Sequence, residues 1–188
     1  MVTACGSSPS ARLAKDLIPV RDLQSAAWGL RITSRGNTLN PFGLKPSGSS
    51  LDTATIASAD AVAIRQWTHG SGALTAGPLP EGLFSVIDSA AHFRSAADAR
   101  ALLADLSSGY GAGSSEPVAG LAGATLLVAP FNFDVPGGRV TGHEDLAIVE
   151  RGAYVFTVLA VGGGSRPTSS DARALATLQA AAIPASLS

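Results

Sequence analysis

Hydrophobic residues are most concentrated in residues 146–161, where two apolar runs flank Arg151 and Gly152. Runs rich in Val, Ile, Leu, Phe and Tyr on either side of a tight corner predict a β-hairpin, in which glycine supplies a positive φ. Side chains alternate along a strand, so the second run has two faces. One face carries Tyr154, Phe156, Val158 and Ala160, and the other carries Val155, Leu159 and Val161. Because neither face suits water, other elements must cover the hairpin.

Two stretches with helical periodicity are the candidates for that cover. Residues 95–109 have apolar positions at i, i+3, i+4 and i+7, namely Ala99, Leu102, Leu103 and Leu106. The second stretch begins near residue 168 and runs to about residue 183, where Pro184 stops it. Each begins with a hydroxyl residue followed three positions later by Asp, a pattern that resembles a capping box. We therefore expect two capped amphipathic helices.

Both helices contain the pentapeptide Asp-Ala-Arg-Ala-Leu, at residues 98–102 and 171–175. One interpretation is a duplicated half, in which a β-rich segment is followed by a helix. The other is coincidence, because Asp, Ala, Arg and Leu recur readily in capped amphipathic helices. Both interpretations lead to the same architecture.

Shorter segments complete the predicted fold. Apolar patterns predict strands at residues 30–33, 61–68, 84–93 and 126–131, and a short helix at residues 11–18. Residues 34–52 contain many Gly, Asn, Pro and Ser residues, which predict a long loop. We therefore expect one α+β domain over residues 11–188, with antiparallel strands in one sheet and helices packed mainly on one face.

Composition narrows the range of partners. The 188-residue chain has 13 Lys and Arg against 14 Asp and Glu, so its charges nearly cancel. That balance lacks the basic excess expected for binding to nucleic acid or anionic lipid. No apolar run approaches the roughly 20 residues needed to span a bilayer. We expect no nucleic-acid partner, and any membrane attachment should be through lipid.

The only cysteine, Cys5, lies in a pattern that suggests such a lipid. Residues 2–5, Val-Thr-Ala-Cys, resemble a bacterial lipobox, and the small residues that follow resemble a flexible tether over residues 1–10. A basic segment and an apolar segment, which normally precede a lipobox, are missing before Val2. The alternative is an ordinary free cysteine. A single cysteine excludes intrachain disulfides.

Catalytic motifs are absent from the sequence. It has no nucleophile elbow, phosphate-binding loop, dinucleotide-binding glycine motif or zinc-protease motif. The best polar constellation is His143-Glu144-Asp145, of which only His143 and Asp145 can share a face of a strand. A metal or acid/base site there would need a partner from elsewhere: His69, His92 or Asp134. The alternative is a solvated strand entrance. No cofactor is expected.

Two further features concern binding and packing. Trp28 and Trp67 could line a pocket for a carbohydrate or a lipid, although buried core aromatics are the commoner use. Asp88 and His92 lie in the same predicted strand, and we expect them to pair on its outer side.

The order of these features resembles actinobacterial cell-envelope lipoproteins of unassigned function. The likeness rests on the lipobox-like Cys5, on Trp28-Gly29, on residues 93–106 and on residues 148–161. Some of these lipoproteins resemble the extracellular sensor domains of receptor kinases, and others resemble a PsbP-like α/β sandwich. The two-cysteine pattern of some sensor domains is absent here.

The resemblance implies an exported, lipid-anchored domain without a catalytic signature. Our first hypothesis is therefore a non-catalytic extracytoplasmic domain, anchored to the membrane by lipid at Cys5, that binds a small apolar ligand or an envelope protein. The alternative is a hydrolase or metal-dependent enzyme that uses His143 and Asp145 with another histidine.

Overall fold

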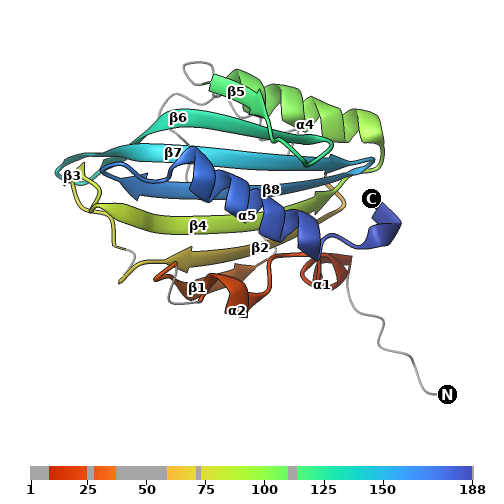
Figure 1. Cartoon of the computed structure of the whole chain (residues 1–188), viewed down its shortest axis with the longest axis horizontal. Helices are drawn as coiled ribbons and strands as arrows, with labels where there is room; N and C mark the ends of the chain where they lie inside the picture. The colour runs from red at the N-terminus through yellow and green to blue at the C-terminus, as the bar shows by residue number, and fades with distance from the viewer. Residues whose placement is uncertain (1–8, 25–27, 37–58, 71–72, 110–113, 188) are drawn as a thin grey trace.

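A single antiparallel sheet forms the centre of the structure (Figure 1). The computed structural model describes residues 9–24, 28–36, 59–70, 73–109 and 114–187. Within these residues the sheet has eight strands. Its main path runs, in spatial order, through β1 (Arg31–Gly36), β2 (Ala61–Thr68), β4 (Gly82–His92), β8 (Tyr154–Gly163), β7 (Gly138–Arg151), β6 (Ala124–Val135) and β5 (Ser114–Pro117). The short strand β3 (Gly77–Pro78) pairs in parallel with β7.

The predicted hairpin is confirmed as β7 and β8, which pair from His143 with Gly162 to Arg151 with Tyr154. The two turn residues are Gly152 and Ala153, one position later than the expected corner. Gly152 has a φ of 60°, which a two-residue hairpin turn with glycine at its first position requires. Both faces of β8 are buried, as the alternation of its apolar residues predicted.

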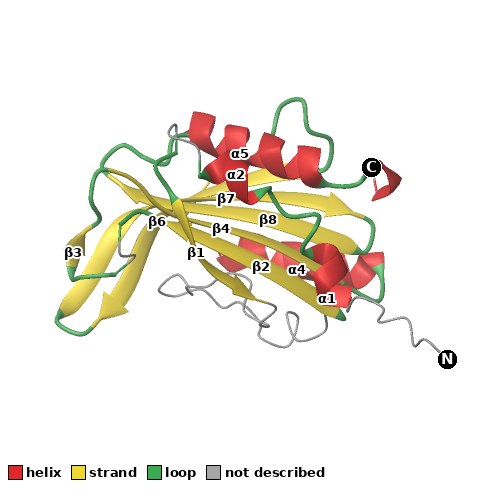
Figure 2. Cartoon of the chain, turned by 90° about the horizontal axis from the view of Figure 1, so that it is seen from below, coloured by secondary structure: helices red, strands yellow, loops and turns green. Residues whose placement is uncertain are grey.

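Helices cover both faces of this sheet, and the two long helices lie on opposite sides of it (Figure 2). The apolar stripe of α4 (Ala96–Gly109) packs against one face. On the other face, α5 (Ser169–Ala182) is joined by α1 (Pro9–Leu13) and α2 (Val20–Leu23). The α+β prediction is therefore confirmed, with the helices of the described residues mainly on one face and α4 on the other.

Capping explains the pentapeptide that the two long helices share. In α5, Thr168 Oγ1 accepts the Asp171 N–H, and the Asp171 carboxylate accepts the Thr168 N–H at 2.8 Å. In α4, Ser95 Oγ accepts the Asp98 N–H at 3.2 Å and donates to Asp98 Oδ2 at 2.8 Å. In both helices the hydroxyl residue therefore accepts the N–H of the Asp, and the following Ala and Leu are buried. Both copies of the pentapeptide therefore lie at the start of a capped helix.

Glycines allow the segment before β4 to pack closely on the end of β8. A Cβ atom at Gly162 would overlap the Gly82 carbonyl oxygen, and one at Gly163 would overlap the Leu79 carbonyl oxygen. Only residues without a side chain permit this approach of backbone to backbone. Residues 162–163 therefore belong to the packed sheet.

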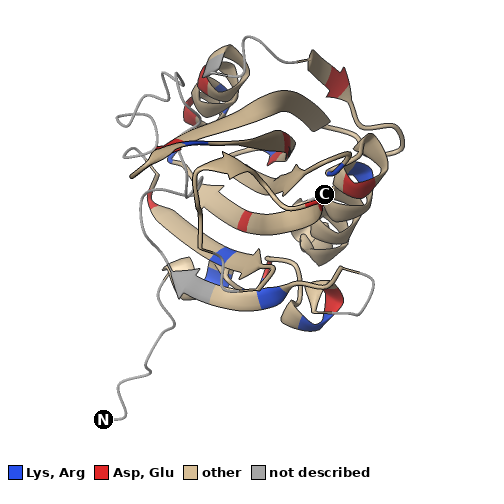
Figure 3. Cartoon of the chain, turned by 90° about the vertical axis from the view of Figure 1, so that its left-hand side faces the viewer, with Lys and Arg blue, Asp and Glu red and all other residues tan. Residues whose placement is uncertain are grey.

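Positions of Lys and Arg and positions of Asp and Glu both occur on several elements of the described chain (Figure 3). This distribution agrees with the near-zero net charge of the sequence. None of the helices in the described part of the chain has the length and apolar character needed to cross a membrane.

Candidate ligand-binding site

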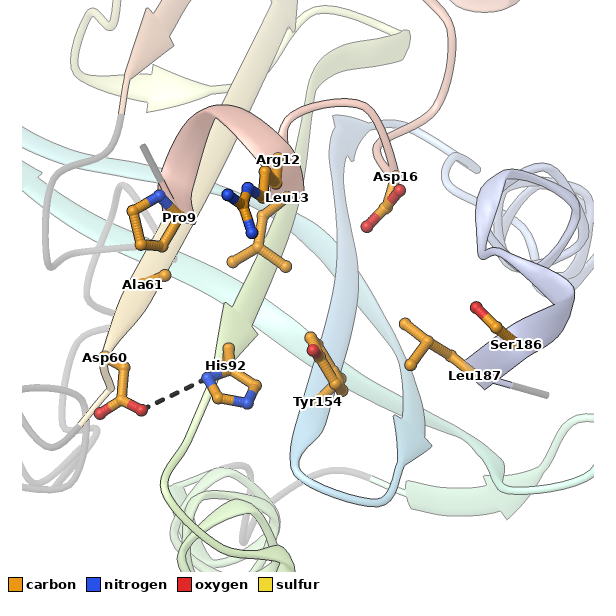
Figure 4. Close-up of a pocket in the computed structure, with 10 residues that line it drawn as sticks. All are labelled: Pro9, Arg12, Leu13, Asp16, Asp60, Ala61, His92, Tyr154, Ser186 and Leu187. Atoms are coloured by element: carbon orange, nitrogen blue, oxygen red, sulfur yellow. Dashed lines mark ion pairs between the residues drawn. The ribbon is translucent and has the colours of Figure 1, made fainter. Parts of the chain in front are cut away.

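A cavity of about 460 Å³ lies at the end of the sheet nearest α1 (Figure 4). Its walls come from α1 and the turn after it, the start of β2, the end of β4, the start of β8 and the C-terminal turn η1 (Ala185–Leu187). The apolar residues that line it are Pro9, Leu13, Ala61 and Leu187, and the polar ones are Arg12, Asp16, Asp60, His92, Tyr154 and Ser186. Segments far apart in the sequence therefore build one concave site.

The strand side of the cavity is an aromatic surface backed by an ion-pair network. The rings of His92 and Tyr154 lie 4.5 Å apart between centroids, tilted by 51°. His92 Nδ1 lies 3.4 Å from Asp60 Oδ2, and Arg94 Nε lies 3.4 Å from Asp60 Oδ1. Each carboxylate oxygen of Asp60 therefore faces a nitrogen of a different side chain.

The opposite wall carries two charged side chains of opposite sign, Arg12 and Asp16. Arg12 is exposed and Asp16 is half-buried, and neither forms an ion pair with another described residue. Burial raises the pKa of Asp16, and the nearby Lys15 charge partly offsets this effect. The apolar side chain of Leu13 anchors this wall in the core.

Side chains of the sheet hold this wall in place through its backbone. Arg65 on β2 donates to the Ile18 carbonyl at 2.7 Å, to the Leu17 carbonyl at 3.3 Å and to the Ala14 carbonyl at 2.5 Å. Asp88 Oδ2 on β4 accepts the Ile18 N–H at 2.6 Å. From α5, Gln179 Nε2 donates to the Asp16 carbonyl at 2.8 Å. We call Arg65 and Asp88 the N-terminal clamp.

Asp88 is completely buried, and its environment favours the neutral acid. Burial raises its pKa to about 8, against the opposing effects of the Ile18 N–H and the Arg65 charge. Asp88 Oδ1 has no hydrogen-bond partner among the described residues. The predicted Asp88–His92 pair is wrong, because four residues along a strand separate two side chains by about 13 Å. His92 instead pairs with Asp60, and Asp88 binds the N-terminal segment.

A comparison with solved structures finds one protein of similar fold. The chain is similar in fold to the extracellular domain of PknH from Mycobacterium tuberculosis. The match covers 93% of this chain and 95% of the PknH domain, with a TM-score of 0.57 and 12% sequence identity. At that identity the likeness to PknH establishes the fold alone. No protein-family model matches the chain, and no curated protein does.

The structure keeps the predicted catalytic residues in separate surroundings. His143 is exposed on β7 and pairs in register with Gly162, whereas His92 lies at the other end of the sheet, opposite Tyr154. His69 Nδ1 lies 3.3 Å from the Gly29 carbonyl oxygen. Asp134 Oδ1 accepts from Arg139 Nε at 2.7 Å, which holds the pKa of Asp134 below its usual value. The described residues contain no group of three His, Cys, Asp or Glu that could hold a metal ion.

Residues 143–145 are not a solvated strand entrance, because β7 begins five residues earlier, at Gly138. Glu144 and Asp145 are only 1% and 2% exposed, and they point to opposite faces of the sheet. Burial, with the Asp145 charge, raises the pKa of Glu144 to about 8. Burial, with the charges of Asp171 and Glu116, raises the pKa of Asp145 to about 6. These two acids therefore lie in the core, and neither lines the cavity.

The predicted ligand contacts lie away from the cavity. Trp67 has no exposed surface, and Trp28 is half-buried against the same group of core residues. Neither residue lines the cavity described above. Cys5 lies outside the described residues. Sequence reasoning placed Tyr154 on the correct face of its strand, but it gave no signal that Arg12, Asp16 or Asp60 would meet it.

Proposed function

We propose that the chain is a non-catalytic, extracytoplasmic binding domain that takes a small molecule in this cavity. The cavity itself carries the proposal. Its volume of about 460 Å³ lies in the range of roughly 300–1,000 Å³ typical of small-molecule sites. Four apolar and six polar residues line it, so it offers both apolar contact and converging polar groups to a ligand. An enzyme using His143 and Asp145 has no comparable support from the described residues.

An extracytoplasmic location is supported by two independent likenesses. PknH contributes a domain of similar fold that is described as extracellular. Residues 2–5 resemble a lipobox, and Cys5 lies only four positions before Pro9, where α1 begins. We propose that a lipid on Cys5 anchors the domain, with the residues between Cys5 and the start of α1 at Pro9 as the tether. The cavity would then face the space close to the membrane surface.

Detergent partitioning tests the anchor. The native gene is expressed in a bacterium that processes lipoproteins, and the product is separated with a cloud-point detergent and weighed by mass spectrometry. We expect the protein in the detergent phase, with the mass of a diacylglycerol on Cys5. Cys5→Ser should move it to the aqueous phase. An unmodified Cys5 in an aqueous-phase protein would refute the anchor.

A screen of small molecules by isothermal calorimetry tests the binding function. Ser186 lines the cavity, so Ser186→Trp should fill it and abolish binding of any hit. The matched control is Ser107→Trp, at an exposed position on α4 outside the cavity, which should bind normally. If hits bind Ser186→Trp and the control equally, the cavity is not the site. Binding of an envelope protein that survives Ser186→Trp would favour the protein-partner alternative.

A further inference from the structure

The two charges on the α1 side of the cavity indicate which class of ligand it accepts. We infer that the cavity binds a small zwitterion with an apolar body, such as an amino acid or short peptide with an apolar or aromatic side chain. The inference rests on the proposed binding function and assigns its ligand class. Arg12 takes the carboxylate, Asp16 takes the ammonium, and the body lies against Tyr154 and Leu13.

The charges that line the cavity favour a ligand with one positive and one negative group. Three acidic or basic residues with a fixed charge line the cavity: Arg12, Asp16 and Asp60. Asp60 already has an ion-pair partner in Arg94, whose Nε lies 3.4 Å from Asp60 Oδ1, and its other carboxylate oxygen lies 3.4 Å from His92 Nδ1. Arg12 and Asp16 have no ion-pair partner among the described residues. The site therefore offers one cation and one anion.

The two opposite sides of the cavity differ in character. In Figure 4, Arg12, Leu13 and Asp16 lie on one side of the cavity, and His92 and Tyr154 lie on the other. A ligand between them has its charged end within reach of the α1 wall and its body against an aromatic ring. Aromatic surfaces suit both apolar bodies and ammonium groups.

Desolvation favours a zwitterion over the other ligand classes. A neutral apolar ligand would remove water from the half-buried Asp16 without replacing the hydrogen bonds of that water, which is unfavourable. A ligand with one charge would satisfy one of these residues and leave the other without a partner. Only a zwitterion provides a charge-assisted hydrogen bond to both.

A matched set of probes tests the charge requirement by calorimetry at low salt. L-phenylalanine and alanyl-phenylalanine are the zwitterions, 3-phenylpropionate lacks the ammonium, phenethylamine lacks the carboxylate, and 3-phenylpropanamide carries no charge. We expect the better zwitterion to bind about tenfold more tightly than each singly charged analogue, and the amide to bind most weakly. Raising the salt concentration should narrow these differences.

Two variants assign the charges to residues. Arg12→Met should weaken binding of the zwitterion about tenfold and leave the affinity for phenethylamine unchanged. Asp16→Asn should also weaken binding of the zwitterion about tenfold, but it should leave the affinity for 3-phenylpropionate unchanged. Both positions are outside the core, so the fold should persist. Arg21→Met is the matched control, because the Arg21 side chain is 88% exposed and does not line the cavity.

The outcomes separate this inference from the binding function. If the uncharged amide binds as tightly as the zwitterions and Ser186→Trp abolishes that binding, the cavity is a binding site and the zwitterion inference fails. If none of the probes binds, the inference fails, and the broader screen decides the binding function separately. Equal effects of Arg12→Met and Arg21→Met would also overturn the inference.

Discussion

Asp88 connects the interior of the sheet to the N-terminal segment. Its side chain is fully buried, it accepts the Ile18 N–H at 2.6 Å, and its pKa is raised to about 8. The group is therefore mostly a neutral acid near pH 6, with one oxygen still accepting a hydrogen bond. An asparagine can reproduce that arrangement, whereas an alanine cannot.

Asp88→Asn should change the free energy of unfolding little at pH 6, because it keeps the acceptor and lacks a charge. Asp88→Ala should lower it by about 1–3 kcal/mol, because the buried Ile18 N–H loses its partner. Urea denaturation monitored by circular dichroism measures both. Equal losses for the two variants would show that the hydrogen bond to Ile18 is not what Asp88 contributes.

The side chain of Thr168 caps the start of α5. Thr168→Ala removes the oxygen that accepts the Asp171 N–H, and we expect a loss of about 1 kcal/mol in the free energy of unfolding. Thr177→Ala is the matched control, since Thr177 is exposed on α5 and only donates to the Arg173 carbonyl. If both variants lose the same stability, the capping box does not stabilise α5.

At the scale of elements, local patterns predicted most of the secondary structure. The strand expected at residues 61–68 coincides with β2, and the capped helices coincide with α4 and α5. Periodicity and capping residues act over a few positions, so they are visible in the sequence. The helix expected at residues 11–18 is shorter, because α1 ends at Leu13. Beyond Leu13, the backbone N–H and carbonyl of Ile18 instead form hydrogen bonds with the side chains of Asp88 and Arg65. These bonds join segments that are distant in the sequence, so no local pattern predicts them.

Arg65→Met tests whether the clamp holds the α1 wall. The variant removes the donors to three carbonyl groups of this segment, so we expect faster hydrogen exchange in residues 9–18 and normal exchange in α5. Arg31→Met, at an exposed position on β1, is the control. Exchange measured by mass spectrometry that stays unchanged in residues 9–18 would refute the clamp.

At the scale of the whole molecule, the cavity could not be predicted because five separate segments build it. Residues near position 12, position 60, position 92, position 154 and position 186 meet only through the order of strands in the sheet. The sequence showed that Tyr154 shares a face with Phe156, and it gave the amphipathic pattern of the helices. Which ends of those elements leave space between them depends on tertiary packing.

Because of its buried acids, the folded protein should be more stable at acidic pH than at alkaline pH. The folded-state pKa values of Asp88, Glu144 and Asp145, about 8, 8 and 6, all exceed their unfolded values near 4. The stability that these groups contribute is fully present below pH 4, and it is lost as the pH rises toward those folded-state values. We expect a higher melting temperature at pH 5 than at pH 8.5, and Asp88→Asn should reduce the difference. A higher melting temperature at pH 8.5 would contradict this assignment.

The most direct test of the account is to map ligand binding on the full chain by NMR. ¹H–¹⁵N spectra are recorded while the zwitterionic probe, or the best compound of the screen, is added. We predict saturable shifts confined to the cavity, with the largest changes at Ala61, His92 and Tyr154, and their loss in Ser186→Trp. Saturable shifts centred elsewhere, for example on β5 and β6, would contradict the assignment of this cavity as the binding site.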